Sequence, residues 1–471
     1  MKKKRITSVL ASIAVFATVA AAVPMNAGAY DTLLGSTSAP PIDKHLVMDI
    51  DANAPNASFE FDIEKFDSTK AEGALYKAAE TTNDIDVFNG VVGSSENAVT
   101  YTIGDTATNT MTFSPADTSS AVVEGTAGIS NEIAWNDTGD GKIGNEKCVS
   151  KSIVFDFSKV KFPTPGVYRY LITEKPATSN KAIRNDISFT TEGTNTYRTL
   201  DVLVRDYKLY YDSLSAEGKE GLTAPDPSKE ELIVLSYVFY AGKYTDGPKG
   251  APSEGVIKSD SFTNKYTTYD LTIGKDVTGN QASKDKYFAV TVSISGAVAG
   301  TKYDVSYADD GNDFTTDGSN AETTVSPNSA TTCFTAEKSQ PTSLTVGTDG
   351  TVSQVFYLKH GQRIAIRGIA ETTAYTVTEA NEDYSASVTP VLTASGETIS
   401  GTSYEINDEH NSVAVSKIVG DNSIVFTNTK TGILPTGILV SVAGPAVVGV
   451  IALLGIAVLL IRGKRRKAEE E

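Results

Sequence analysis

A lysine, a glutamate and an asparagine in the C-terminal half of the chain stand at positions where strand alternation predicts apolar residues. Alternate residues of a β-strand face the same side of a sheet. Lys275, Glu379 and Asn428 each share the parity of the apolar residues around them, which are Leu271, Ile273 and Val277, then Tyr375 and Val377, then Ile424 and Phe426. The pattern predicts that an amine, a carboxyl and a carboxamide meet inside one apolar core.

The N-terminal half repeats this arrangement in the same chain order. Lys44, Glu174 and Asn264 share the parity of neighbouring apolar residues, which are Ile42, Leu46 and Met48, then Tyr168, Tyr170 and Ile172, then Phe262. The lysine again comes at the start of its half and the asparagine at the end. Two sets in one order favour a shared chemistry over coincidence.

These three residue types can form a covalent cross-link. Burial lowers the pKa of a lysine and raises that of a glutamate. A neutral amine is a nucleophile, and a protonated carboxyl can donate to the asparagine carbonyl and polarise it. We therefore expect isopeptide bonds Lys44–Asn264 and Lys275–Asn428, assisted by Glu174 and Glu379, with loss of ammonia. The alternatives are an ordinary buried Lys–Glu pair, or strand-end side chains that turn to solvent.

The elements that would position these residues are β-strands. Thr, Ser, Val, Gly and Tyr are abundant, and alternating apolar and polar runs are common, which is typical of antiparallel all-β sandwiches. Strands are expected near 41–50, 58–63, 152–157, 167–173, 196–204, 231–240, 261–264, 269–277, 287–295, 351–358, 364–366, 374–379, 385–392 and 423–428. We expect a short helix at 71–79 and a long polar insertion at 300–345.

Both ends of the chain carry targeting patterns. Four basic residues, an apolar stretch and Ala27-Gly28-Ala29 predict a secretory signal peptide over 1–29. At the other end, Leu434, Pro435, Thr436 and Gly437 precede an apolar run over 438–461 and a basic cluster. A run of roughly 20 apolar residues can cross a bilayer, and the basic cluster would stay in the cytoplasm. The simplest interpretation is a single-pass anchor.

Composition narrows the function classes. The net charge of −17 argues against nucleic-acid binding and against docking on anionic lipid. Two cysteines far apart give no disulfide framework, and three scattered histidines predict no metal site. No Gly-rich phosphate loop is present, so no cofactor is expected.

The C-terminal order of motif, apolar span and basic tail resembles a Gram-positive cell-wall sorting signal, in the X-X-Pro-Thr-Gly form of pilin subunits. That resemblance implies that sortase cuts between Thr436 and Gly437. The second half resembles a Cna B-type domain, on residues 274–280, 358–362, 375–379 and 426–430. The first half resembles a streptococcal pilin isopeptide linkage domain, on residues 43–44, 166–174 and 262–266. The resemblance implies Lys–Asn isopeptides assisted by Glu, and Lys258 is the nearest match to the lysine that polymerises T-antigen-type pilins.

We therefore expect an all-β surface protein with two tandem Ig-like β-sandwiches, an isopeptide-linkage domain over 36–266 and a Cna B-type domain over 267–430, followed by a sorting signal over 431–471. The expected function is a structural subunit of a sortase-assembled pilus, anchored in the cell wall from a membrane-bound precursor. Its partners would be sortase, other pilin copies, peptidoglycan and a host surface. The alternative is a monomeric wall-anchored adhesin. An enzyme is disfavoured, since no catalytic group remains beyond the bond-forming residues.

Overall fold

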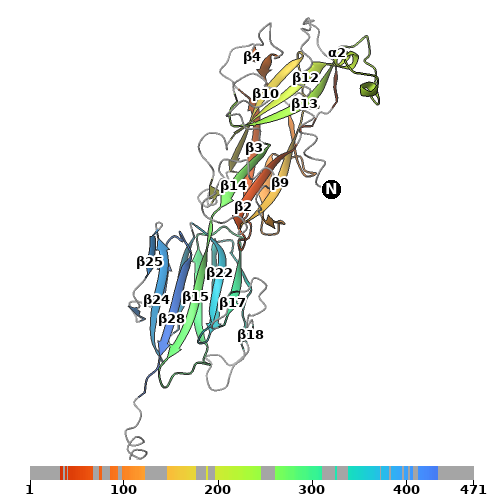
Figure 1. Ribbon diagram of the computed structural model, residues 1–471. Helices are drawn as coiled ribbons and strands as arrows, with labels where there is room; N and C mark the ends of the chain where they lie inside the picture. Colours follow the sequence, from red (N-terminus) through yellow and green to blue (C-terminus); the bar gives the residue numbers. More distant parts are fainter. Residues whose placement is uncertain are drawn as a thin grey trace, which may run out of the picture.

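The structure is a computed structural model, and it describes residues 32–432 with gaps, the longest of which are 67–73, 77–84, 122–145, 177–186, 189–196, 245–259, 315–323 and 326–337. The predicted signal peptide, Lys258 and residues 433–471 lie outside the described residues. Within the described part, the chain is nearly all β (Figure 1). No helix there is both long enough and apolar enough to span a membrane.

The first fourteen strands form two sheets. Their bounds are β1 (Thr32–Gly35), β2 (Ile42–Asp49), β3 (Ala57–Lys65), β4 (Ala74–Tyr76), β5 (Val87–Asn89), β6 (Thr100–Ile103), β7 (Thr110–Phe113), β8 (Ser120–Ala121), β9 (Glu146–Asp156), β10 (Gly166–Pro176), β11 (Ile187–Ser188), β12 (Tyr197–Asp206), β13 (Glu231–Ala241) and β14 (Ser261–Tyr266). One sheet has the order β1-β13-β12-β10-β3-β7, with β4 and β5 attached beside β10. The other has the order β11-β14-β2-β9-β6, with β8 attached to β9.

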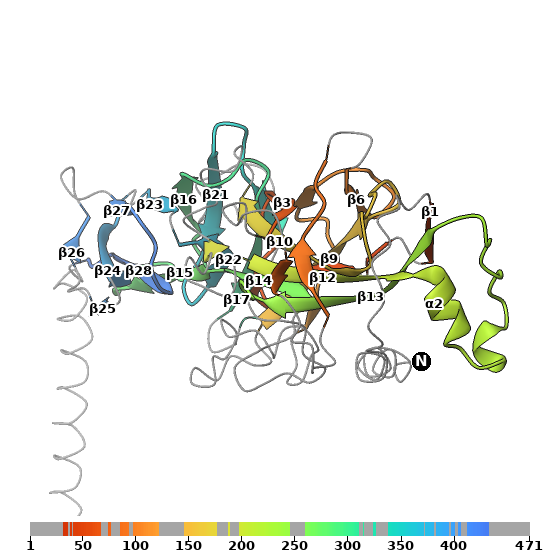
Figure 2. The ribbon, with the colours of Figure 1, turned by 90° about the horizontal axis from the view of Figure 1, so that it is seen from above.

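The remaining strands form a second set of sheets. Their bounds are β15 (Thr268–Thr278), β16 (Phe288–Ser295), β17 (Lys302–Ala308), β18 (Thr324–Val325), β19 (Lys338–Ser339), β20 (Ser343–Thr345), β21 (Thr351–Leu358), β22 (Arg363–Ala370), β23 (Ala374–Glu379), β24 (Ser385–Ala394), β25 (Glu397–Ser400), β26 (Tyr404–Glu405), β27 (Ser412–Val415) and β28 (Asn422–Thr429). The larger sheet has the order β20-β17-β22-β15-β28-β24-β25, with β26 on β24. It faces the sheet β21-β16-β23-β27 (Figure 2), while β18 and β19 pair alone.

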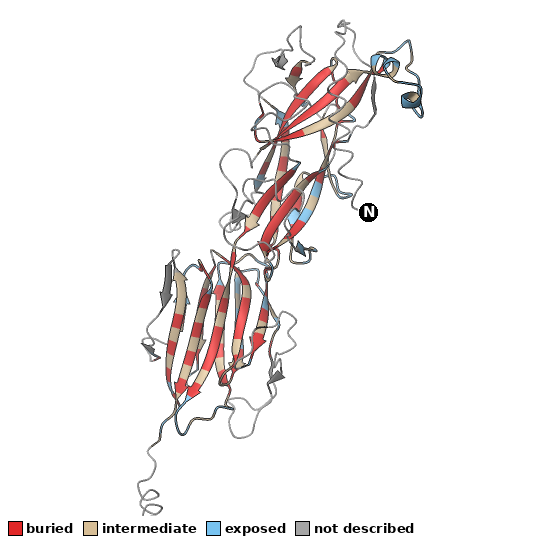
Figure 3. Cartoon of the chain, in the orientation of Figure 1, coloured by how far each residue is buried: buried red, intermediate tan, exposed pale blue. Residues whose placement is uncertain are grey.

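Each half has its own apolar core, built by strand alternation. In β3 the side chains of Ala57, Phe59, Phe61 and Ile63 are buried while those between them are partly exposed. The same alternation runs along the strands of the second half (Figure 3). One cluster of buried apolar side chains fills the first half and extends to Ala370 at the joint, and another fills the second half. The expected all-β sandwich fold is confirmed.

The two halves are stacked lengthwise and joined by almost continuous strand. Only Thr267 separates β14 from β15, and Figure 1 shows one strand leading into the next. Loop residues of the first half reach across the joint, where Asn56 Nδ2 donates to the Ala299 carbonyl at 2.8 Å. Gly368 packs on Ala52 so closely that an added Cβ would lie 2.7 Å from the Ala52 Cα.

Three segments differ from, or refine, the sequence expectations. The helix expected at 71–79 is wrong, because Ala74–Tyr76 forms β4, which pairs with β5. The expected polar insertion at 300–345 contains β17, whose Tyr303 and Val305 are buried in the larger sheet. The polar segment after β12 contains a short helix, α2 (Tyr207–Asp212), and a 3₁₀ turn, η4 (Glu217–Lys219), at the end of the molecule far from β24–β28 (Figure 2).

Candidate functional site

In the second half, three strands bring Lys275, Glu379 and Asn428 together inside the core. Lys275 lies on β15, Glu379 ends β23, and Asn428 lies near the end of β28. The Lys275 Nζ is 2.8 Å from Glu379 Oε1, and Asn428 Nδ2 donates to the same oxygen at 3.3 Å. All three side chains are buried. The carboxyl therefore contacts both the amine and the carboxamide.

In the first half, Lys44, Glu174 and Asn264 lie on β2, β10 and β14 and make the matching contacts. The Lys44 Nζ is 3.1 Å from Glu174 Oε2, and Asn264 Nδ2 donates to Glu174 Oε1 at 2.7 Å. All three are again buried. Here the two carboxylate oxygens bridge the two nitrogens, whereas in the second half one oxygen serves both.

The register of the strands is the same in the two sites. β14 runs parallel to β2, and β28 runs parallel to β15. In each parallel pair the lysine stands opposite a phenylalanine, and the asparagine follows that phenylalanine by two residues. Side chains two residues apart share a face. The lysine and asparagine are therefore diagonal neighbours on the core face of both sheets.

Burial sets the charge state of the second site. Desolvation lowers the pKa of the Lys275 ammonium to about 8, although the adjacent Glu379 carboxylate opposes this change. About a tenth of the amine is therefore neutral at pH 7. The Asn428 Oδ1 is buried and accepts no hydrogen bond from the described part of the chain.

The carboxyl faces the carboxamide nitrogen in both sites, which differs from the carbonyl contact expected from the sequence. The Asn nitrogen is the atom that leaves when an amine displaces it. A carboxyl touching both nitrogens can accept a proton from the lysine and deliver it to the leaving group. This arrangement is suited to amide exchange between the two side chains.

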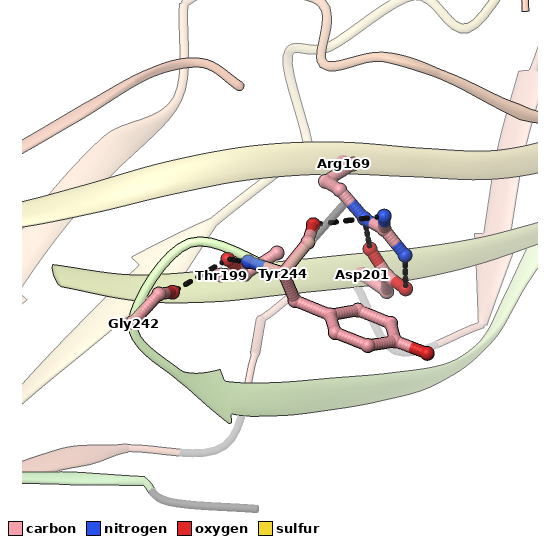
Figure 4. A network of polar contacts seen from close by, with 5 residues as sticks. All are labelled: Arg169, Thr199, Asp201, Gly242 and Tyr244. Carbon is pink, nitrogen blue, oxygen red and sulfur yellow. Dashed lines mark hydrogen bonds and ion pairs between the residues drawn. The ribbon is translucent and has the colours of Figure 1, made fainter. Parts of the chain in front are cut away.

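Sequence reasoning missed a third buried polar network, shown in Figure 4. Arg169 on β10 makes two hydrogen bonds to Asp201 on β12, Nε to Oδ1 at 2.7 Å and Nη2 to Oδ2 at 2.8 Å. Its Nη1 donates to the Tyr244 carbonyl at 3.0 Å, and Thr199 Oγ1 donates to the Gly242 carbonyl at 2.7 Å. Arg169 has the opposite parity to the core residues Tyr168 and Tyr170. The network therefore holds the segment after β13 against the face of the sheet that is turned away from the core.

The remaining predicted site residues lie outside the described residues. These are Leu434, Pro435, Thr436 and Gly437 of the sorting motif, and Lys258. Among the described residues, no group of three or more His, Cys, Asp and Glu side chains is arranged to hold a metal ion.

Comparisons with known proteins give the following matches. Residues 269–430 match a family described as a domain of unknown function (DUF7601). Among solved structures, the major pilin from Streptococcus pyogenes is 19% identical, with 85% of this chain and 100% of that chain covered and a TM-score of 0.42. The major pilin T3.2 of S. pyogenes serotype GAS13637 is 16% identical, with 84% and 100% covered and a TM-score of 0.40. A pilus-presented adhesin, Spy0125 (Cpa), is 15% identical, with 47% and 44% covered and a TM-score of 0.22. No curated protein sequence matches the chain.

Proposed function

We propose that the protein is a structural subunit of a covalently polymerised cell-surface pilus, stabilised by isopeptide bonds Lys44–Asn264 and Lys275–Asn428. The observation that carries the proposal is the repeated site, in which a buried amine, carboxyl and carboxamide meet at the same strand register in each half. An ordinary buried ion pair does not require a carboxamide on the same carboxyl, and here both sites have one. On this proposal, 36–266 and 267–430 are two separately cross-linked domains.

The reaction balances without any further reagent. Glu379 takes a proton from the Lys275 ammonium, and the neutral amine attacks Cγ of Asn428. The new C–N bond forms as the Cγ–Nδ2 bond breaks. Glu379 gives its proton to the departing nitrogen and takes one from the attacking nitrogen, so ammonia leaves. The carboxyl then ionises, and the freed proton makes ammonium. Glu174 serves Lys44 and Asn264 in the same way.

The polymer would be joined by sortase at the C-terminal motif. The cut between Thr436 and Gly437 leaves an acyl-enzyme, which the amine of Lys258 on the next subunit, or an amine of peptidoglycan, would resolve. The protein is then a substrate of sortase and not itself an enzyme. Other copies of the chain, sortase and peptidoglycan are the proposed partners, and the proposed location is the wall of a Gram-positive cell.

Intact-mass measurement of the purified chain tests the cross-links. We expect the mass to be lower than that of the unmodified sequence by two ammonias. Asn264→Ala and Asn428→Ala should each restore one ammonia, which assigns the bonds. A parent chain with its full unmodified mass would rule out both.

Wall extracts test the polymer. An antibody to the protein should detect a ladder of covalent multimers that disappears in Thr436→Ala. Lys258→Ala should also abolish the ladder while leaving a single wall-linked band. A single band in the parent would instead favour the monomeric adhesin.

A further inference from the structure

Each buried lysine amine lies over the face of a phenylalanine ring. The Lys44 Nζ is 4.6 Å from the centroid of Phe59, and the Lys275 Nζ is 4.4 Å from that of Phe288. Both rings are almost fully buried. They occupy equivalent places, because β3 follows β2 along the chain as β16 follows β15.

The rings are held in place by the same kind of neighbour. Phe113 packs edge-on against Phe59, with centroids 5.5 Å apart and an interplanar angle of 87°. Tyr384 packs edge-on against Phe288 at 5.1 Å and 89°. An ion-paired lysine lies over each of these outer rings, Lys151 at 5.2 Å and Lys286 at 5.1 Å. A core that needed only apolar volume would not require this stack twice.

We propose that Phe59 and Phe288 are positioning residues, whose ring faces hold the lysine amine between carboxyl and carboxamide until the bond forms. This inference rests on the proposed cross-linking. A ring face attracts a cation within about 6 Å of its centroid, and more strongly when water is excluded. The ring thus fixes one side of the amine, and the carboxyl contacts it as well. Reactions between two held groups are sensitive to displacements of roughly 1 Å.

The ring should also affect how the rate of bond formation depends on pH. The exchange needs one proton shared by Lys275 and Glu379, so the rate should fall as the pair loses that proton, at about pH 8. The charged groups that act on this amine are Glu379 from β23 and Asp276, the next residue on its own strand. Lys286 lies over the same Phe288 ring, with its Nζ 5.5 Å from the centroid. Because the ring favours the ammonium, its removal should let the pair lose the proton at lower pH.

The test follows bond formation in the full chain. The chain is recovered in denaturant from inclusion bodies, its unreacted mass is checked, and it is diluted into buffers between pH 5 and 10. Samples are quenched over time, and the Lys275–Asn428 peptide is quantified after digestion. Phe288→Leu should lower the maximal rate about tenfold and move the alkaline fall in rate down by roughly 0.5–1 pH unit. The Lys44–Asn264 bond in the same molecules should form at the parent rate.

Matched variants separate positioning from packing. Phe356→Leu removes a buried ring from the main apolar cluster of the second half, where it packs against Tyr307, and it should leave the pH profile unshifted. Phe288→Tyr keeps the ring face and should retain the parent profile. If Phe288→Leu does not fold, a trifluorinated phenylalanine at 288 weakens the ring charge at nearly constant shape and should give the same shift.

The outcomes distinguish the two proposals. An unshifted profile in Phe288→Leu, or in the fluorinated chain, would overturn the positioning role while the cross-link stands. A parent chain that never loses ammonia on refolding would overturn the cross-link itself.

Discussion

At the scale of single residues, each proposed cross-link should depend on its assisting carboxyl. Glu379 touches both Lys275 and Asn428, so Glu379→Ala removes the carboxyl that contacts both the amine and the carboxamide. We expect the variant to fold and to lose one ammonia where the parent loses two. Peptide mapping should find the Lys44–Asn264 bond intact, which serves as the internal control. If the Lys275–Asn428 peptide still forms, the assisting role of Glu379 is wrong.

The lysine pKa predicts how an uncross-linked second half responds to pH. In Asn428→Ala the amine stays ionisable, with a pKa of about 8 when folded and about 10.5 when unfolded. Between these values the unfolded chain binds more protons, so the free energy of unfolding should rise with pH from 8 to 10.5. The gain is on the order of 2–3 kcal/mol. It is lost again as the pH falls to 8.

Denaturant unfolding at pH 8, 9 and 10 measures this gain. Asn428→Ala combined with Lys275→Met is the matched control, because it lacks the titrating amine and keeps every other group. The difference between the two variants should grow with pH in the stated direction. A constant difference would show that Lys275 titrates alike in the folded and unfolded chains.

The pair of Arg169 and Asp201 should stabilise the first half through charge compensation. Both side chains are buried, so Asp201→Asn leaves the guanidinium without a counter-charge, at about 3–5 kcal/mol of lost stability. The double variant Arg169→Met with Asp201→Leu should recover much of that loss, since apolar residues can replace a buried pair. Thermal unfolding compares the variants, and Asp105→Asn, at an exposed position of the first half, is the control. Equal stability of Asp201→Asn and the control would contradict this account.

At the scale of elements, the sequence predicts which residues meet better than it predicts which strands pair. Parity alone indicated that Lys44, Glu174 and Asn264 share one interior, because side chains of a strand alternate strictly. The parallel pairing of the first and last strands of each half depends on contacts between distant segments, and a local pattern does not contain it. The contact between Arg169 and Asp201 was missed for the same reason, since it needs the register of β10 against β12.

Two element errors have local causes. The alanines of 71–79 favour helix on propensity, but the pairing of β4 with β5 prevails over that weak preference. Sequence reasoning missed the strand β17 because its segment is polar overall. Tyr303, Val305 and Tyr307 nevertheless alternate with polar residues and are buried. Counting alternation in that window, instead of composition, would have found it.

The joint between the halves depends on a glycine. Gly368 has φ of +71° and no room for a side chain beside Ala52, so Gly368→Ala adds both backbone strain and a clash. Gly296→Ala is the matched control, because its φ is +77° and nothing lies within 4 Å of the added Cβ. We expect Gly368→Ala to loosen the joint more, seen as a wider distribution of sizes in small-angle scattering and faster proteolysis. Identical profiles for the two variants would show that the close packing at Ala52 does not matter.

At the scale of the whole molecule, the two halves are stacked end to end, and one nearly continuous strand joins them. The last strand of the first half is continuous with the first strand of the second, with Thr267 alone between them. Asn264 lies on one and Lys275 on the other. With both bonds formed, tension applied along the molecule passes from Asn264 through this strand to Lys275 and across the second bond to Asn428. The hydrogen-bonded sheets on either side then carry little of the load.

The two proposed bonds would give the chain a simple topology around this near-continuous strand. Residues 44–264 and 275–428 would become two closed covalent rings, and 265–274 would be the one bridge between them. A single cut inside a ring opens it without releasing a piece, whereas a cut in the bridge divides the molecule. The bridge is also the part whose backbone is bonded into β14 and β15. Limited proteolysis should therefore give nicked chains that stay in one band on a denaturing gel and gain one water in mass. In Asn264→Ala the first ring is open, so cuts within 44–264 should release fragments, whereas cuts within 275–428 should not. Release from the parent by cuts inside either ring would mean that this ring is not closed.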